Sequence, residues 1–221
     1  MRVLMSRHSE GFEHSYLPHA EVAIKRLGRE SGLFDTVTTA RSRLITADEL
    51  ARYDVLIFAT TGELPLDGDQ KRALLDFVRG GKGFVGIHNA TDTFYKWPEY
   101  GEMVGGYFAG HPWTQEVTVN VEDTSHPAVA MLGDSFQVSD EIYTFRDWDR
   151  SKTHVLMSLD NSSVDLSKGG REDGDHAMGW CHEYGKGRVI YTALGHPDEL
   201  WEQPWFLDHV LACVKWAGRL I

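Results

Sequence analysis

Histidines and acidic residues stand where short apolar runs of this sequence end. The run Gly83–Ile87 stops at His88, and Asp92 follows four residues later. Such a run is typical of a strand buried on both faces, and open α/β sheets place their ligands at the carboxyl ends of their strands. We therefore expect His88 to lie at the edge of a cleft, with Asp92 as a carboxylate partner.

Three further strand-like runs lead to polar side chains in the same way. The first run is followed by His14, the Val55–Ala59 run by Thr61, and the Val189–Ala193 run by His196. Because parallel strands end at one edge of a sheet, groups that are far apart in sequence converge there. For any single histidine a solvated or satisfied loop position is the commoner case, so the prediction depends on the set.

Two kinds of chemistry fit several imidazoles beside a carboxylate. Neutral histidines with a carboxylate suit zinc or another divalent transition metal. Neither His-Glu-x-x-His nor Cys-x-x-Cys occurs, so a metal would need dispersed ligands. The candidate metal ligands are His111, His182 and His196. The alternative is metal-free acid–base catalysis by His88 with Asp92 or Glu141 as its partner, and the sequence leaves both open.

Thiol catalysis is not expected. Cys181 and His182 are neighbours on a predicted strand, so their side chains point to opposite faces and cannot form a dyad. Cys213 lies on the apolar stripe of the last predicted helix. The segment around His88 has the small-x-nucleophile-x-small form of a nucleophile elbow, but an imidazole takes the place of serine or cysteine.

The elements that must position these residues alternate between strand and helix. Strands near residues 3–5, 36–39, 55–59 and 83–87 are separated by amphipathic helices, and the pattern resumes at 188–193 before a last helix opened by Pro204. This order predicts an α/β fold with a mostly parallel central sheet. Between residues 97 and 182 only strands at 117–121 and 154–159 stand out, and 160–175 is a polar loop. We expect one domain, 1–221, with an irregular insertion at about 97–182.

Aromatic residues gather just beyond His88. Trp97 and Tyr107 belong to this group, and their rings could stack on the apolar side of a sugar. Core packing is the commoner use of such residues and is the alternative.

Composition excludes several classes of partner. The chain has 221 residues, 42% hydrophobic and 25% charged, as soluble globular proteins have. A net charge of −11 argues against nucleic acid and anionic membranes. Two cysteines favour a reducing compartment, and no apolar segment approaches the roughly 20 residues of a membrane span. We expect a cytoplasmic protein that forms a homodimer, the commonest oligomer.

Several motifs together resemble those of the trehalose-utilisation, or ThuA-like, family. They occur in the family's order and span nearly the whole chain. The matching segments are Gly11–His14, Gly83–Phe94, Trp97–Gly101, Gly105–Phe108, His111-Pro112, Asp140–Tyr143, Trp180–Gly185 and Thr192–His196. The resemblance implies a flavodoxin-like three-layer sandwich similar to class I glutamine amidotransferases. It does not imply amidotransferase activity, because His88 stands where the cysteine would be.

The resemblance also implies a small-molecule sugar substrate, through use of trehalose or related disaccharides by way of keto-sugars. The first hypothesis is therefore an enzyme acting on a keto-sugar or glycoside, as a lyase, isomerase or hydrolase. His88, Asp92 and Glu141 would be catalytic, and the expected substrate contacts are His14, Thr61, Trp97 and Tyr107. The alternative is a sugar-binding or sensing module without catalysis. Hydrolysis of a small amide or ester is a third option, which the missing nucleophile disfavours.

Overall fold

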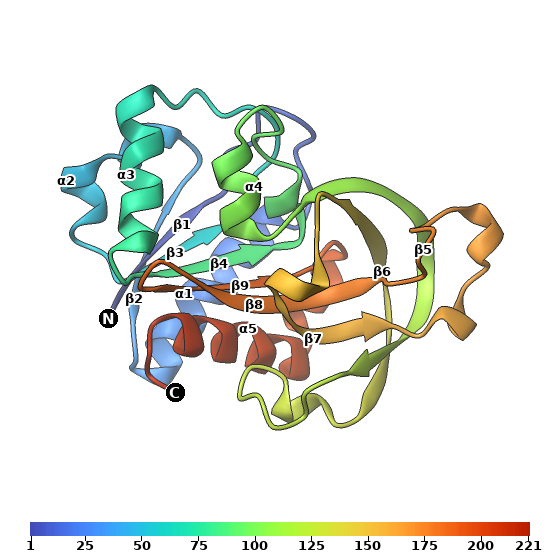
Figure 1. Cartoon of the computed structure of the whole chain (residues 1–221). Coiled ribbons are helices and arrows are strands. Elements are labelled where there is room, and N and C mark those ends of the chain that lie inside the picture. Colours follow the sequence, from blue (N-terminus) through green and yellow to red (C-terminus); the bar gives the residue numbers. More distant parts are fainter.

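A single mixed β-sheet of nine strands organises the molecule, in the order β2-β1-β3-β4-β9-β8-β7-β5-β6 (Figure 1). The computed structural model describes residues 1–221. The strands are β1 (Arg2–Ser6), β2 (Asp35–Thr39), β3 (Val55–Phe58), β4 (Gly83–Ile87), β5 (Tyr107–Val121), β6 (Ser135–Arg146), β7 (His154–Leu159), β8 (Ala177–Tyr184) and β9 (Gly187–Thr192). The helices are α1 (Leu17–Ser31), α2 (Ala47–Leu50), α3 (Gly68–Arg79), α4 (Pro98–Val104) and α5 (Pro204–Ala217).

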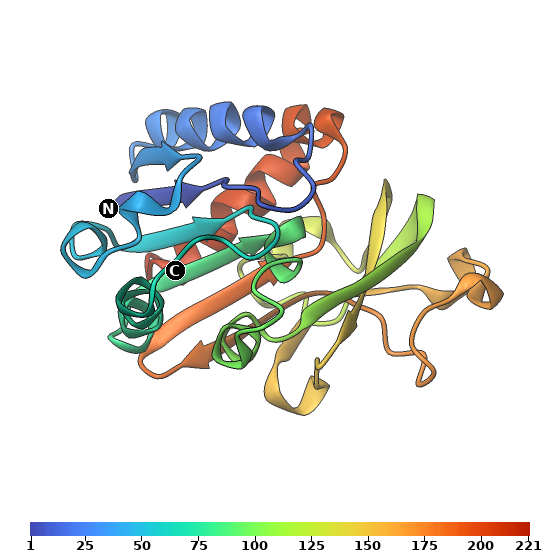
Figure 2. The ribbon, with the colours of Figure 1, turned by 90° about the horizontal axis from the view of Figure 1, so that it is seen from above.

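The half of the sheet formed by β2, β1, β3, β4 and β9 is entirely parallel. Helices α1 and α5 pack side by side on one face of it, and α2, α3 and α4 cover the other (Figure 2). This half confirms the α/β prediction.

Local sequence explains these elements. Every residue of β3 and β4 is buried, as their uninterrupted apolar runs indicate. Helix α3 begins at a capping box in which the Asp67 side chain accepts the Gln70 amide and the Gln70 side chain accepts the Asp67 amide. Pro204 lies in the first turn of α5, where its missing N–H costs nothing.

The second half of the sheet corrects the sequence-based expectation. Strands β8, β7, β5 and β6 pair antiparallel, so the sheet as a whole is not mostly parallel, and the segment 97–182 is not irregular. Strand β5 runs from Tyr107 to Val121, whereas only its last part was predicted, and β6 was not predicted at all. Register shifts around Gly110 interrupt the alternation that would have marked the start of β5.

Strand direction decides which edge of the sheet each strand end reaches. Strands β1, β3, β4 and β9 run the same way, so the segments that follow them emerge at one edge. Strand β8 runs against β9 and pairs His182 with Val189, so β8 ends at the opposite edge. No helix of the structure is both long and apolar enough to cross a membrane.

Candidate active site

Four side chains meet at the edge where the parallel strands end. They come from the loop after β1, the end of β4, the strand β6 and the loop after β9, and their potential ligand atoms all lie within 4.8 Å of one another. We name this group the His–Glu cluster; its members are His14, His88, Glu141 and His196.

His88 is the most deeply placed member. It opens a short 3₁₀ turn directly after β4, with a positive φ of 40°, and is fully buried. Its Nδ1–H donates to the carbonyl oxygen of Ala193 at 2.7 Å. Its buried Nε2 has no hydrogen-bond partner and lies 3.5 Å from Oε2 of Glu141. With the proton on Nδ1, Nε2 can present an unused lone pair to the cluster.

His14 is oriented by two buried neighbours. The Tyr16 hydroxyl donates to Oδ1 of Asn89 at 2.7 Å, and Nδ2 of Asn89 donates to Nδ1 of His14 at 3.2 Å. In this arrangement the neutral ring carries its proton on Nε2. An Asn89 amide turned by 180° would accept a proton from Nδ1 instead and leave Nε2 as a lone pair. Burial, followed by the charges of His88 and His196, lowers the pKa of His14 to about 3.

Glu141 is the carboxylate of the cluster. Its Oε1 lies 3.3 Å from Nδ1 of His111 and 3.8 Å from Nε2 of His196. Burial alone would raise the pKa of Glu141, but the close approach of His88 and the charges of the surrounding imidazoles lower it. Glu141, predicted as a partner of His88, also lies beside the predicted metal ligand His111, which is half-exposed.

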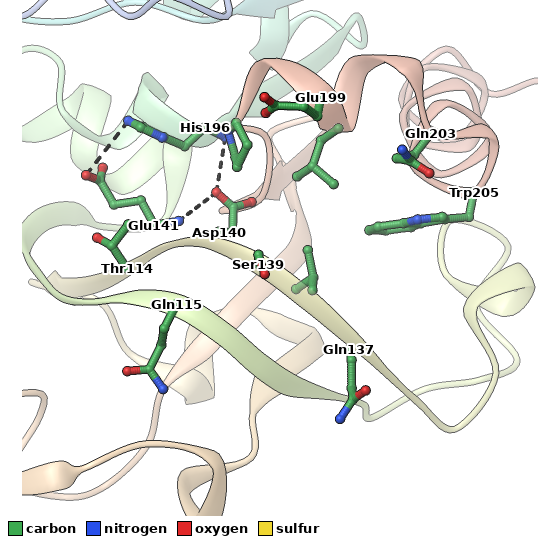
Figure 3. Close-up of a pocket in the computed structure, with 13 residues that line it drawn as sticks. Thr114, Gln115, Gln137, Ser139, Asp140, Glu141, His196, Glu199, Gln203 and Trp205 are labelled. Atoms are coloured by element: carbon green, nitrogen blue, oxygen red, sulfur yellow. Dashed lines mark hydrogen bonds and ion pairs between the residues drawn. The ribbon is translucent and has the colours of Figure 1, made fainter.

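Asp140, which the sequence analysis did not single out, fixes two members of the cluster. Its fully buried carboxylate accepts the amide N–H of Glu141 at 2.8 Å and of His196 at 3.2 Å (Figure 3), and also that of Gly195 at 2.8 Å. Burial raises the pKa of Asp140 to about 6 in spite of these contacts. The only sequence signal was its place beside Glu141 in the Asp140–Tyr143 segment.

Asp92 lies close to the cluster without belonging to it. The Tyr95 hydroxyl donates to its Oδ1, and burial raises the pKa of the Asp92 carboxyl. The charges of His88 and Glu141 also act on the Asp92 carboxyl, His88 lowering its pKa and Glu141 raising it.

The expected convergence of His182 with His88 and His196 is wrong. Because β8 is antiparallel to β9, His182 lies level with the start of β9 and not with its end. Its Nε2–H donates to the Met103 carbonyl at 3.0 Å, and it lines a separate cavity.

Three other predicted contact residues are used within the protein. The Thr61 hydroxyl donates to the carbonyl of Phe12 in the His14 loop. Trp97 is only 7% exposed, and the Tyr107 hydroxyl donates to its carbonyl. Tyr107 also lines the cavity that holds His182. Their contact with substrate stays a prediction that this placement does not favour.

A cavity of about 510 Å³ opens beside the His–Glu cluster. Asp140, Glu141 and His196 line one end of it, and Gln203 and Trp205 line the other (Figure 3). Its volume falls within the roughly 300–1,000 Å³ usual for small-molecule sites.

Comparison with known proteins identifies a family model and solved structures that resemble this chain. The family model described as trehalose utilisation, ThuA, matches residues 2–217. A protein of Bacteroides uniformis described as ThuA-like is 25% identical, with a TM-score of 0.83 over 98% of this chain and 91% of that chain. A second ThuA-like protein, from Parabacteroides merdae, is 19% identical, with a TM-score of 0.77 over 99% of this chain and 90% of that chain.

A β-galactosidase from Bacillus circulans shares the fold alone. It is 14% identical, with a TM-score of 0.62 over 96% of this chain and 30% of that chain. No curated protein sequence matches the chain. Since the family model covers nearly every residue, the chain belongs to the trehalose-utilisation (ThuA) family.

Proposed function

We propose that this chain is a carbohydrate-processing enzyme whose His–Glu cluster holds one divalent metal ion. The observation that carries the proposal is the buried Nε2 of His88, which has no partner and is aimed at Glu141. A buried nitrogen left unpaired costs about 1–3 kcal/mol, and a metal ion would remove that cost. The family description supports a role in carbohydrate utilisation.

The donor set fits such an ion. Three imidazoles and one carboxylate suit zinc, whose bonds to such ligands are about 2.0–2.2 Å, which separates tetrahedral ligand atoms by about 3.4 Å. The Nε2 of His88 and Oε2 of Glu141 already lie 3.5 Å apart. The widest separations in the cluster, up to 4.8 Å, need to shorten by up to about 1.4 Å.

Outer contacts prepare the ligands for this role. The Ala193 carbonyl holds the proton of His88 on Nδ1, so Nε2 faces the cluster. The low pKa of His14, about 3, keeps that ring neutral, and Asn89 can accept its Nδ1 proton after an amide turn. Asp140 fixes the backbone of both Glu141 and His196.

A bound ion would polarise a carbonyl or hydroxyl oxygen of the substrate as a Lewis acid, and this oxygen would be a fifth ligand beside the four that the cluster supplies. In a keto-sugar the ketone acidifies the neighbouring C–H, so a residue beside the cluster has to accept that proton. The proposed proton carriers are Asp92 and His111, each of which interacts with Glu141. Burial raises the pKa of Asp92, which makes it a stronger base than an exposed aspartate. Elimination and isomerisation both need this proton transfer.

Elemental analysis of protein purified without an affinity tag, followed by zinc calorimetry, tests the metal. We expect one ion per chain, lost in His88→Ala and Glu141→Gln. The control His154→Ala removes an exposed histidine from β7 and should keep the ion. A full-length, folded His88→Ala variant with unchanged metal content would overturn the assignment.

A panel of 3-keto-glycosides tests catalysis. We expect turnover by the wild type and by His154→Ala, and a loss of at least 100-fold in Glu141→Gln. Tight binding of the panel by calorimetry without any product would reject the enzyme and favour a sugar-binding module.

A further inference from the structure

The cavity beside the His–Glu cluster has a chemistry of its own. It lies between the edge strand β6 and the segment 197–205, and we name it the β6 groove (Figure 3). Glu141 and His196 belong to both the groove and the cluster. A ligand in the groove would therefore touch whatever group lies at the cluster.

Uncharged polar side chains form the largest group in the lining. Hydroxyls and amides of this kind both donate and accept hydrogen bonds, as the hydroxyls of a sugar do. They are Thr114, Gln115, Gln137, Ser139 and Gln203. Gln203 is exposed and stands directly before α5 without capping the helix, so its amide is free for a ligand.

Trp205 supplies the one large aromatic surface of the groove. Its ring packs against Phe136 and Phe206 at centroid distances of 5.2 Å and 5.8 Å, which fixes its orientation, and the residue stays partly exposed. A fixed and partly open indole offers a face for the C–H side of a sugar ring.

Charge narrows the choice of ligand. The lining holds Asp140, Glu141 and Glu199 but no lysine or arginine. A phosphorylated or carboxylated ligand would meet repulsion and find no cation. The groove therefore suits a neutral polyhydroxylated group.

We propose that the β6 groove binds a second, uncharged glycosyl or polyol unit of the substrate while the first unit lies at the His–Glu cluster. This inference rests on the proposed function, because it assumes that the reacting unit occupies the cluster. Trp205 and Gln203 are assigned as its binding residues. The substrate is then a two-unit saccharide without phosphate.

Titration calorimetry with unreactive probes tests the groove. The two-ring probes are trehalose, maltose and cellobiose, the one-ring probe is methyl α-glucoside, and the charged probe is trehalose 6-phosphate. We expect the wild type to bind at least one two-ring probe more tightly than the other two kinds. Trp205→Ala should weaken that two-ring binding roughly three- to tenfold, the range that one aromatic contact gives, and leave one-ring binding unchanged.

Two controls keep the result interpretable. Trp216→Ala removes a partly buried tryptophan from the last turn of the same helix and should leave all binding unchanged. Gln203→Ala changes only an exposed side chain, cannot unfold the chain, and should also weaken two-ring binding. Equal binding of one-ring and two-ring probes, tighter binding of the phosphorylated probe, or wild-type affinity in both groove variants would overturn the inference.

The metal measurements separate the two proposals. If Trp205→Ala and Gln203→Ala bind zinc normally but have wild-type affinity for the two-ring probes, the groove assignment fails while the proposed function stands. If the groove variants lose two-ring binding in a protein that binds no metal and turns over nothing, the proposed function fails and the groove remains a saccharide site.

Discussion

Replacing Asp140 by asparagine separates the cost of burying a charge from the benefit of positioning the cluster. The carboxylate is 2% exposed and accepts three backbone N–H groups, from Glu141, Gly195 and His196. In Asp140→Asn the amide oxygen keeps two of these bonds, but the amide nitrogen meets the N–H of Gly195. That mismatch costs about 1–3 kcal/mol.

Removing the negative charge has the opposite effect, because it spares the folded protein the cost of burying an ionised carboxylate. The pKa of Asp140 is raised from 3.8 to about 6, which at 1.36 kcal/mol per pKa unit is a cost of about 3 kcal/mol when the folded protein is fully ionised. Because the folded-state pKa lies above the unfolded-state value, the folded protein binds more protons between about pH 4 and pH 6, and stability falls as the pH rises through that window. Between pH 5 and pH 8 the linkage relation lowers the free energy of unfolding of the wild type by about 1.4 kcal/mol. The variant does not show this decrease, because its amide does not titrate.

Urea unfolding of chelator-treated protein at pH 5 and pH 8 measures this directly. We expect the variant to be less stable than the wild type at pH 5 and to approach it at pH 8, within about 2 kcal/mol. Its zinc affinity should fall 10–100-fold, since Asp140 supports two of the ligands. The control Asp208→Asn removes one exposed negative charge and should change neither quantity. A stability difference that does not depend on pH, or an unchanged zinc affinity, would refute the reasoning.

Four further outcomes follow from the same geometry. Zinc at 100 times its dissociation constant should stabilise the apoprotein by about 2.7 kcal/mol, because it binds only the folded chain. Thermal unfolding with and without chelator measures this, and equal melting temperatures would contradict the prediction. The His14 ring should not titrate between pH 5 and pH 8 by NMR, because burial lowers its pKa to about 3; a midpoint near 6.5 would show an accessible ring. Asn89→Leu leaves the buried Tyr16 hydroxyl and His14 Nδ1 without partners, so the free energy of unfolding should drop by at least about 1–3 kcal/mol. Wild-type stability in urea would contradict the two hydrogen bonds assigned to Asn89. His182→Ala should bind zinc as the wild type does, because His182 lies at the edge of the sheet opposite the His–Glu cluster. Weaker zinc binding in calorimetry would contradict this position of His182.

Sequence patterns predicted the parallel half of the fold because each signal there is local. The β4 run and the proline that opens α5 both lie where the structure has them. Strand β7 was also predicted with its observed bounds. The antiparallel half depends on pairing between segments far apart, and the register shifts in β5 hide its alternation.

Site residues were predicted correctly where the direction of the preceding strand could be inferred from the sequence. His88 and His196 follow parallel strands and meet as expected, and Glu141 joins them. His182 was misplaced because the reversal of β8 depends on its pairing with β9, which no local pattern shows. The role of Asp140 was missed because three amides from two distant segments define it.

The bend at His88 has a consequence for engineering this protein. A φ of 40° at a residue with a side chain costs about 1–2 kcal/mol, which glycine would avoid. His88→Gly would relieve that strain, but it would also empty a fully buried site and leave the Ala193 carbonyl without its donor, at a cost at least as large. The bend and the ring therefore cannot be optimised separately, because any substitution that relaxes the backbone here also removes the imidazole and its packing.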